Sequence, residues 1–381
     1  MKVLLKLFKL ILNLIYPVFK LFSVRENKIV VFSRQADIPS LDIRMLRREL
    51  EKRGFEVVVC AKRLTYNFSR MFVYMIHILR QLYHLATSRL VIIDSYCIPV
   101  SNLKHRKDLK VIQMWHATDA IKQFGWQTVG KKGGSSVEMA SEMNMHKGYD
   151  YILSPSELTS DHYYEAFKAT PQQIVKIGLP RFDYILDRGK AEERARKIIE
   201  KYPELNDRNK KTILYAPTFR KGAGVNLTDF VQSIDFAKYN VIIKQHSLDG
   251  VPELPWTIGS IILNPDFETY DLFEVSDIIV SDYSSIISEA SLVRKPIYLY
   301  NYDKEKIKRE TGLNIDFADF KIGAYEFKTA NDLIDAFEKP YDLSAVDEIR
   351  ETFIDVNTEN VTGELADFIE GILKSSKQDK G

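Results

Sequence analysis

The sequence predicts an α/β protein built from two doubly wound halves that face a ligand cleft. Short apolar runs alternate with longer helix-like stretches from residue 28 to residue 178, the pattern of a parallel sheet wrapped by helices. After a charged stretch the same alternation resumes and continues to residue 301. A chain of 381 residues with 45% hydrophobic residues has ample material for two cores.

Apolar runs mark the strands of both halves. The first set comprises 28–32 (KIVVF), 56–60 (EVVVC), 90–94 (LVIID), 111–115 (VIQMW), 151–155 (YILSP) and 174–178 (IVKIG). The second set comprises 212–217 (TILYAP), 240–246 (NVIIKQH), 260–265 (SIILNP), 277–282 (DIIVSD) and 296–301 (PIYLYN). A charged helical segment and a polar turn separate the sets, and we place the boundary between residues 190 and 191. A final helix is expected from Glu359 to Leu373, where it could cross back to the first half.

Residues 1–23 are predicted to form an amphipathic helix in the membrane interface. Polar positions recur at steps of three, four or seven and form a narrow stripe on an otherwise apolar helix: Lys2, Lys6, Lys9, Asn13 and Lys20. The lysines interrupt the roughly 20 apolar residues that a spanning helix needs, and no signal-peptide cleavage site follows. The stripe favours anionic lipids and a cytoplasmic body. A packed helix of the fold and a signal or spanning segment are the alternatives.

Composition limits the other classes of site. Cys60 and Cys97 lie far apart in apolar runs, so neither a disulfide framework nor a cysteine-ligated zinc is expected. GxGxxG, P-loop and HExxH motifs are absent. The net charge is only +2, with a basic excess confined to the N-terminus, and no nucleic-acid partner is expected. The run 68–86, with its two histidines, is predicted to be a packed amphipathic helix, not a ligand site or a second membrane contact.

The first candidate site residue is a histidine at a strand end. Ligands of open α/β sheets bind at the carboxyl ends of the strands, and His116 directly follows the run 111–115. Its ordinary pKa, near 6.5, suits a group that accepts a proton from an attacking hydroxyl. The alternative is a histidine that is merely hydrogen-bonded in a loop.

The second half places two further groups at strand ends. Thr218 and Arg220 follow one strand, and Lys244 and His246 end the next, which favours a cationic pocket for phosphate oxygens. The third group follows the strand 277–282. It combines Asp282 with a helix start whose free N–H groups and hydroxyls would bind an anion, and with a glutamate that would accept from ribose hydroxyls: Ser284, Ser285 and Glu289. A serine that only caps the helix is the alternative.

With these residues assembled, the chain resembles the CDP-glycerol glycerophosphotransferase family of teichoic acid synthesis. The matching segments keep the family's order: QMWHATDAIK, SPSELTSDHYYEAF, IGLPRFDYI, ILYAPTFR, IIKQH and SDYSSIISEASLVRKPIYLY. The resemblance implies two Rossmann-like domains in a glycosyltransferase-B-like arrangement. Residues 24–190 would bind the acceptor, residues 191–381 would bind CDP-glycerol, and the protein would sit peripherally on the cytoplasmic face of the membrane.

The resemblance also assigns roles. His116 becomes the candidate general base, and His246 matches a histidine that contacts the donor phosphates. Arg220, Ser284 and Ser285 match donor-phosphate positions, and Glu289 stands where the family often has aspartate. Arg181, in GLPR, would reach the cleft or make an interdomain structural contact.

Departures from the common family pattern point to the acceptor. Where the family commonly reads WHGTPLK, this chain has Ala117 and then Asp119 to Lys122, which looks more like the wall teichoic acid primases. The expected reaction transfers one glycerol phosphate from CDP-glycerol to a disaccharide on undecaprenyl diphosphate and releases CMP. No cofactor is required by the sequence and no DxD-like pair implies a metal. Anionic inner-leaflet lipids, and other teichoic acid enzymes, are expected partners.

Several alternatives stay open. Primer-extending or ribitol-phosphate-using relatives share the same core motifs. The helix start near Ser284 would also serve a nucleotide-sugar glycosyltransferase or epimerase, although the two motif histidines speak against it. A membrane-bound nucleotide-binding protein without catalysis is the non-enzyme alternative.

Overall fold

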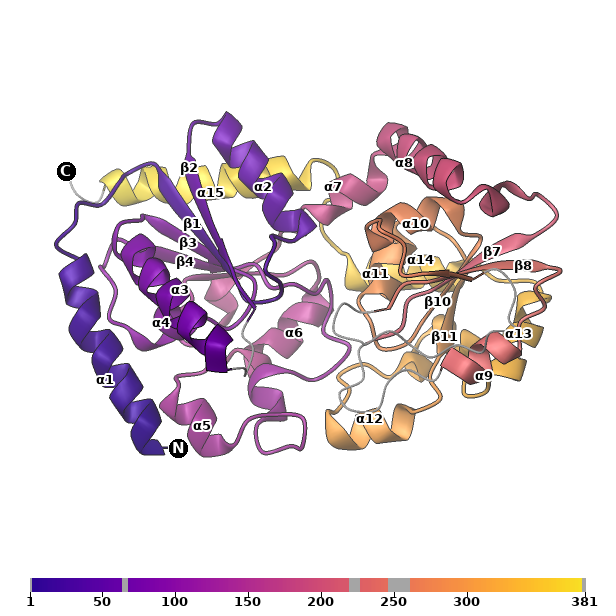
Figure 1. The fold of residues 1–381 in the computed structure, drawn as a ribbon, viewed down its shortest axis with the longest axis horizontal. Coiled ribbons are helices and arrows are strands. Elements are labelled where there is room, and N and C mark those ends of the chain that lie inside the picture. The colour runs from indigo at the N-terminus through magenta and orange to yellow at the C-terminus, as the bar shows by residue number, and fades with distance from the viewer. Residues whose placement is uncertain (1, 64–67, 219–226, 246–260, 379–381) are drawn as a thin grey trace. The chain divides into compact units, whose positions relative to one another are not determined.

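A computed structural model describes residues 2–63, 68–218, 227–245 and 261–378. The predicted α/β class with two parallel sheets is confirmed (Figure 1). Unit 1 comprises residues 1–118, 123–183 and 356–381, and unit 2 comprises residues 119–122 and 184–355. The main division falls after Asp183, a few residues before the boundary expected from the charge pattern. The predicted cleft between the halves stays a prediction.

Unit 1 contains a six-stranded, fully parallel sheet in the order β2-β1-β3-β4-β5-β6. Its strands are β1 (Lys28–Ser33), β2 (Glu56–Ala61), β3 (Leu90–Ile93), β4 (Lys110–Gln113), β5 (Tyr151–Leu153) and β6 (Ile174–Val175). Its helices are α1 (Lys2–Phe19), α2 (Leu41–Lys52), α3 (Phe68–Ala86), α4 (Ile98–Asn102), α5 (Val137–Glu142), α6 (Glu157–Ala166) and α15 (Val361–Gln378). Every residue of β1 and β3 is buried, as their unbroken apolar runs predict for strands covered on both faces.

Strand β4 ends at Gln113, two residues before the predicted end of the run 111–115. The reason is local, because Trp115 has a φ of +60°, and a left-handed backbone cannot continue a strand. The turn that carries His116 therefore begins earlier than expected.

The terminal helix α15 belongs to unit 1. The Asp183 carboxylate sets its start, because it accepts hydrogen bonds from the backbone N–H groups of Val361 and Thr362 at 2.8 and 2.7 Å. Arg53, just after α2, hydrogen-bonds to Asp367 at 2.6 Å on the same helix. These contacts return the end of the chain to unit 1.

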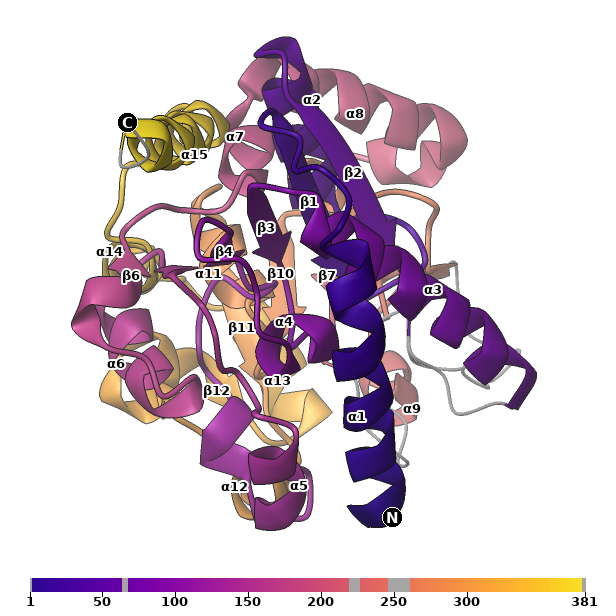
Figure 2. The same ribbon diagram turned by 90° about the vertical axis from the view of Figure 1, so that its left-hand side faces the viewer.

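Helix α1 packs beside α3 (Figure 2), and two of its own side chains, Leu12 and Tyr16, are buried. No helix among the described residues is both long and apolar enough to cross a membrane. The predicted N-terminal helix is present, and its membrane association stays a prediction.

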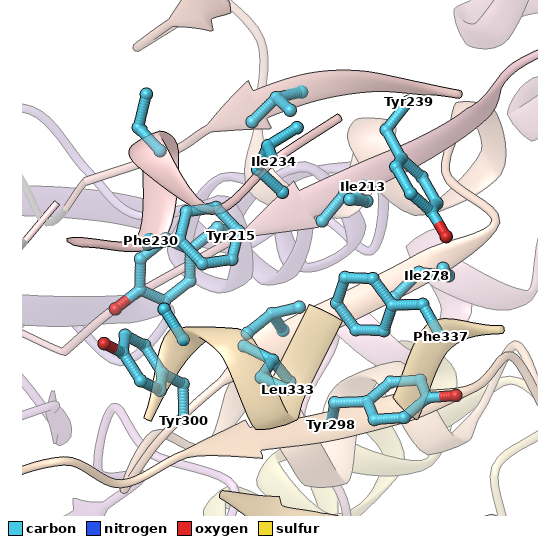
Figure 3. Packing of buried hydrophobic residues seen from close by; sticks show 14 of the residues in the cluster. Ile213, Tyr215, Phe230, Ile234, Tyr239, Ile278, Tyr298, Tyr300, Leu333 and Phe337 are labelled. Carbon is cyan, nitrogen blue, oxygen red and sulfur yellow. The ribbon is translucent and has the colours of Figure 1, made fainter. Parts of the chain in front are cut away.

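Unit 2 repeats the architecture, with a parallel sheet in the order β12-β11-β10-β7-β8-β9. Its strands are β7 (Lys211–Tyr215), β8 (Tyr239–Ile243), β9 (Ile261–Leu263), β10 (Ile278–Ser281), β11 (Ile297–Tyr300) and β12 (Glu326–Phe327). Its helices are α7 (Arg181–Leu186, shared with unit 1), α8 (Arg188–Lys201), α9 (Leu227–Gln232), α10 (Thr269–Val275), α11 (Ile286–Ser291), α12 (Lys304–Glu310), α13 (Ala330–Phe337) and α14 (Ser344–Phe353). One face of the sheet packs an aromatic core around Tyr215, Phe230, Tyr298 and Phe337 (Figure 3).

Candidate active site

His116 lies exposed just beyond the carboxyl end of β4 in unit 1. Its Nδ1 lies 2.9 Å from the backbone carbonyl oxygen of Asp94 and 3.1 Å from the side-chain amide of Gln35. The Asp94 carbonyl oxygen can only accept, which calls for a proton on Nδ1, whereas the Gln35 Nε2 group can only donate, which calls for a lone pair there. The shorter contact, with the carbonyl oxygen, favours the tautomer with a proton on Nδ1. The Nε2 atom then carries a lone pair, which is the form that a general base needs.

The turn before His116 is held by its own side chains. The Gln113 amide oxygen accepts from the Trp115 backbone N–H at 3.0 Å. The Trp115 ring stacks on Phe124, with centroids 4.7 Å apart, and lies 4.2 Å from the His116 ring. A left-handed tryptophan costs about 1–3 kcal/mol and persists only where its surroundings over-determine it. The strained residue, Trp115, is therefore the one directly before the candidate base.

Arg181 also supports His116, from inside unit 1. The Arg181 Nη2 group donates to the His116 carbonyl oxygen at 3.0 Å. Its Nε contacts the two carboxylate oxygens of Asp42 at 3.1 and 3.0 Å, and its backbone N–H donates to one of them at 2.8 Å. The Arg181 and Asp42 side chains are 9% and 2% exposed. The observed contacts of Arg181 are structural and lie within unit 1, so they differ from the expected interdomain contact.

Asp94 carries a buried carboxyl directly after β3, the strand that pairs with β4. Its Oδ1 accepts from the Ser95 hydroxyl at 2.9 Å, while its Oδ2 has no hydrogen-bond partner among the residues that the structure describes. Burial raises the pKa of the Asp94 carboxyl to about 6. Sequence reasoning missed Asp94, Gln35 and Asp42. Asp94 ends the predicted strand 90–94, so the rule that selected His116 could also have selected it.

In unit 2, Asp282 follows β10 and hydrogen-bonds to the segment after β7. It is fully buried, and both carboxylate oxygens lie 3.1 Å from the Thr218 backbone nitrogen, which donates to them. The Thr218 hydroxyl donates to the same carboxylate. The Ser281 hydroxyl donates to the Ala216 carbonyl at 2.7 Å. Thr218 and Asp282, two of the predicted donor-site residues, are therefore hydrogen-bonded to each other.

The predicted cationic pocket is only partly described. Arg220 and His246 lie outside the described residues, and their phosphate contacts stay predictions. Lys244 follows β8, and its ammonium group donates to the Pro265 carbonyl at 2.7 Å. Burial lowers the pKa of Lys244. An ammonium group has three donors, so this one contact leaves capacity for an anion.

The start of α11 carries Ser284 and Ser285, both half-buried. The Ser284 hydroxyl accepts from the Ile286 backbone N–H at 3.4 Å, whereas the Ser285 side chain makes no capping bond. Ser285 is the N-cap residue and its side chain makes no capping hydrogen bond, while the Ser284 contact is a local turn contact.

Two acidic side chains are buried at α11, one on the helix and one beside it. Glu289 is 1% exposed, and Asp119 is 4% exposed with a carboxylate that accepts from the Ser288 hydroxyl at 2.5 Å. Burial, assisted by the charge of Glu289, raises the pKa of Asp119 to about 6 although the Ser288 hydrogen bond opposes the shift. Asp119 marks the departure from the common family motif, and the structure assigns that departure to unit 2.

Comparisons with known proteins identify a matching family and similar proteins. The profile of the family described as CDP-Glycerol:Poly(glycerophosphate) glycerophosphotransferase matches residues 14–371. A teichoic acid ribitol-phosphate primase of Bacillus spizizenii is 29% identical, and the match covers 93% of this chain and 94% of that protein. A teichoic acid glycerol-phosphate primase of Bacillus subtilis is 27% identical over 78% of this chain and 77% of its own length. The solved wall teichoic acid polymerase TagF shares the fold at 17% identity, with a TM-score of 0.74 and coverage of 96% and 94%.

Proposed function

Because the chain belongs to the CDP-glycerol:poly(glycerophosphate) glycerophosphotransferase family, we propose that it primes teichoic acid synthesis. It transfers one sn-glycerol 3-phosphate from CDP-glycerol to a ManNAc-GlcNAc disaccharide on undecaprenyl diphosphate and releases CMP. Support for a primase comes from relatives with that name that match over most of their own length. The observation that supports the chemistry is the 2.9 Å contact between His116 Nδ1 and the Asp94 carbonyl oxygen, which favours the tautomer whose Nε2 accepts a proton.

The reaction is a displacement at phosphorus. His116 Nε2 accepts the proton of an acceptor hydroxyl, whose oxygen attacks the phosphorus that bears glycerol. The bond from that phosphorus to the bridging oxygen breaks, and the electron pair leaves with CMP. Such reactions depend on positioning and on stabilisation of negative charge. We assign that stabilisation to Arg220, Lys244, His246 and the hydroxyls of Ser284 and Ser285.

A variant at His116 tests this mechanism. His116→Asn should lower kcat by about 10²–10⁴-fold, the usual contribution of a general base, while CDP-glycerol affinity measured by calorimetry stays within about threefold. His162→Asn is the matched control, since His162 lies on α6 and has no assigned role. Equal kcat in the two variants would remove His116 from the reaction.

Ribitol phosphate is the second candidate for the transferred group. The match to a ribitol-phosphate primase spans 93% of this chain, against 78% for the Bacillus subtilis glycerol-phosphate primase. CMP release from CDP-glycerol and from CDP-ribitol, with mass analysis of a synthetic disaccharide-diphosphate-lipid product, decides between them. One added glycerol phosphate supports the first proposal. Preference for CDP-ribitol favours the second proposal. A ladder of products indicates a polymerase, and failure to react with the disaccharide lipid refutes the proposed acceptor.

We also propose that the enzyme binds peripherally to the cytoplasmic face of the membrane through α1. Leu10 and Leu14 of that helix are 55% and 65% exposed, so an apolar face is available to lipid. Leu10→Ser/Leu14→Ser should shift the protein from membrane to supernatant in fractionation, with activity on a soluble acceptor retained. Unchanged fractionation would refute anchoring by α1.

A further inference from the structure

One ring nitrogen of His116 has two polar neighbours. Its Nδ1 lies 2.9 Å from the Asp94 carbonyl oxygen and 3.1 Å from the amide nitrogen of the Gln35 side chain. A carbonyl oxygen only accepts hydrogen bonds, and an amide NH2 group only donates them. A proton on Nδ1 satisfies the first contact and a lone pair satisfies the second, so the two contacts cannot be hydrogen bonds at the same time.

The three residues meet because they follow three neighbouring strands. Strand β1 pairs with β3, and β3 pairs with β4. Gln35 lies two residues after the end of β1, Asp94 directly follows β3, and His116 lies three residues after β4. The carboxyl ends of parallel strands meet at one edge of a sheet. Gln35 therefore lies at the same sheet edge as the candidate base, although the two are 81 residues apart in the sequence.

The backbone of Gln35 is anchored, and its side chain has room to turn. The Gln35 backbone N–H donates to the Ser33 hydroxyl oxygen at 3.3 Å, and Ser33 is buried at the end of β1. Gln35 itself is exposed, and its amide makes no hydrogen-bond contact other than that with His116 among the described residues. A half turn of the amide exchanges Nε2 for Oε1, two groups of nearly equal size. The turned amide accepts from Nδ1–H, and both contacts are then satisfied.

We propose that Gln35 is a positioning residue for the transfer reaction, and that its amide oxygen shares the Nδ1–H group of His116 with the Asp94 carbonyl oxygen. The proposal rests on the general-base role proposed for His116. Before the reaction, the two oxygens keep the proton on Nδ1, so Nε2 presents its lone pair to the acceptor hydroxyl. After Nε2 has taken the hydroxyl proton, the ring is a cation with an N–H group at each nitrogen, and the same two oxygens stabilise it. The Nδ1–H bond is unchanged throughout.

Ionisable groups around the candidate base decide how a pH profile is interpreted. They are Arg34 after β1, Asp42 on α2, Asp94 after β3, His146 after α5 and Arg181 on α7. Arg181 and Asp42 form an ion pair, and burial lowers the pKa of His146 to about 3, so these groups keep one charge state near neutral pH. Burial raises the pKa of Asp94 to about 6. Asp94 is present in the parent and in a variant at position 35, so the difference between their profiles reports position 35.

The pH dependence of kcat/KM tests which end of the Gln35 amide faces the ring. This parameter falls at acidic pH as the general base becomes protonated. Gln35→Met removes an acceptor that stabilises the protonated ring, so the fall should move to lower pH by about half a unit. The maximal kcat should be about fivefold lower, the effect of losing one hydrogen bond that water partly replaces. Gln35→Glu keeps an acceptor and adds negative charge, so its fall should move to higher pH with the maximal kcat retained.

Gln172→Glu is the matched control for added charge. Gln172 is exposed in unit 1, in the turn Pro171–Gln173. That turn precedes β6, so it lies at the amino end of a strand, whereas His116 lies at the carboxyl ends. The control should leave the pH profile where it is in the parent. An equal shift in Gln35→Glu and Gln172→Glu would contradict a direct contact with His116.

The direction of the shift in Gln35→Met decides between the two amide orientations. A fall that moves to higher pH shows that Gln35 donates to Nδ1 through Nε2, and this result overturns the proposal. An unchanged profile with a higher KM for the acceptor makes Gln35 a binding residue and also overturns it. His116→Asn separates this inference from the reaction itself. Full activity in His116→Asn refutes the base, whereas an inactive His116→Asn beside an unshifted Gln35→Met refutes only the positioning role.

Nitrogen-15 resonances of the histidine rings give a measurement that does not depend on turnover. A ring nitrogen with a proton and one with a lone pair resonate in separate regions of the spectrum. The chain has seven histidines, and the signals that disappear in His116→Asn belong to His116. Nδ1 should carry the proton in the parent, and Gln35→Met should increase the fraction of molecules with the proton on Nε2. A parent protein whose Nδ1 carries the lone pair would refute the shared Nδ1–H group.

Discussion

Removal of Arg181 should expose how unit 1 supports His116. In Arg181→Met, the Asp42 carboxylate, which is 2% exposed in the parent, loses its guanidinium partner, and of the donors described here the backbone N–H of residue 181 remains. Breaking a buried ion pair on one side costs about 3–5 kcal/mol, because it leaves an uncompensated charge in the interior. We expect a loss of stability of that size in unit 1.

The double variant Asp42→Leu/Arg181→Met separates charge burial from positioning. Replacing a buried ion pair by apolar residues is often neutral, so stability should return to within about 1 kcal/mol of the parent. Activity should not return, because the His116 carbonyl still lacks the donor that lies 3.0 Å away in the parent. Loss of one hydrogen bond, about 1 kcal/mol, corresponds to a several-fold lower kcat.

The measurement must be local because the chain has two units. Hydrogen exchange of peptides from α2 and from the segment around His116 reports unit 1, and steady-state CMP release gives kcat and KM for the donor. If Arg181→Met is as stable as the parent, the predicted cost of leaving the buried Asp42 carboxylate without its partner is refuted. Full recovery of kcat in the double variant would refute positioning of His116 by Arg181.

Four further variants test other parts of the structure. Asp119→Asn keeps an acceptor for Ser288. Because the folded pKa of Asp119 is about 6 against an ordinary 3.8, the folded protein holds its proton more tightly, and stability falls as pH rises through this range. The variant should therefore gain up to about 3 kcal/mol in unit 2 at neutral pH and nothing below pH ~4, and an equal gain at both pH values in urea unfolding would refute the assignment. Gly125→Ala puts a Cβ 2.2 Å from the Ala166 carbonyl oxygen at a φ of +55° and should cost about 2 kcal/mol or more in thermal unfolding, whereas Gly371→Ala, with nothing within 4 Å, should add about 0.5–1 kcal/mol. Asp282→Asn weakens the hold on Thr218 and should raise the KM for CDP-glycerol about tenfold; a KM equal to that of the parent would show that this link does not shape the donor site.

Local patterns predicted the fold because most strands are short apolar runs, and several of them are buried along their whole length. The runs 28–32 and 90–94 correspond to β1 and β3, whose residues are all buried. Boundaries were less accurate where a distant residue sets them. Helix α15 starts at Val361 instead of Glu359, with its first N–H groups bound by Asp183, which lies 178 residues earlier in the chain.

The candidate site was predictable only in part. Position after a strand identified His116, Lys244 and Asp282, because the carboxyl ends of parallel strands meet at one sheet edge. Position could not show that the Asp282 carboxylate holds Thr218. It also could not show that Glu289 is buried, because a single helical glutamate carries no periodic signal of its environment.

The sequence by itself determined the α/β class, the order of the strand ends that carry polar residues, and the family that those residues resemble. These properties are written in short-range hydrophobic periodicity and in ordered motifs. Only the tertiary structure decided which groups contact Nδ1 of His116, the partner of Arg181 and the outward direction of the leucines on α1. Each of these depends on contacts between residues far apart in the chain, such as the carbonyl of Asp94 beside His116 and Asp42 beside Arg181, and such contacts leave no local pattern.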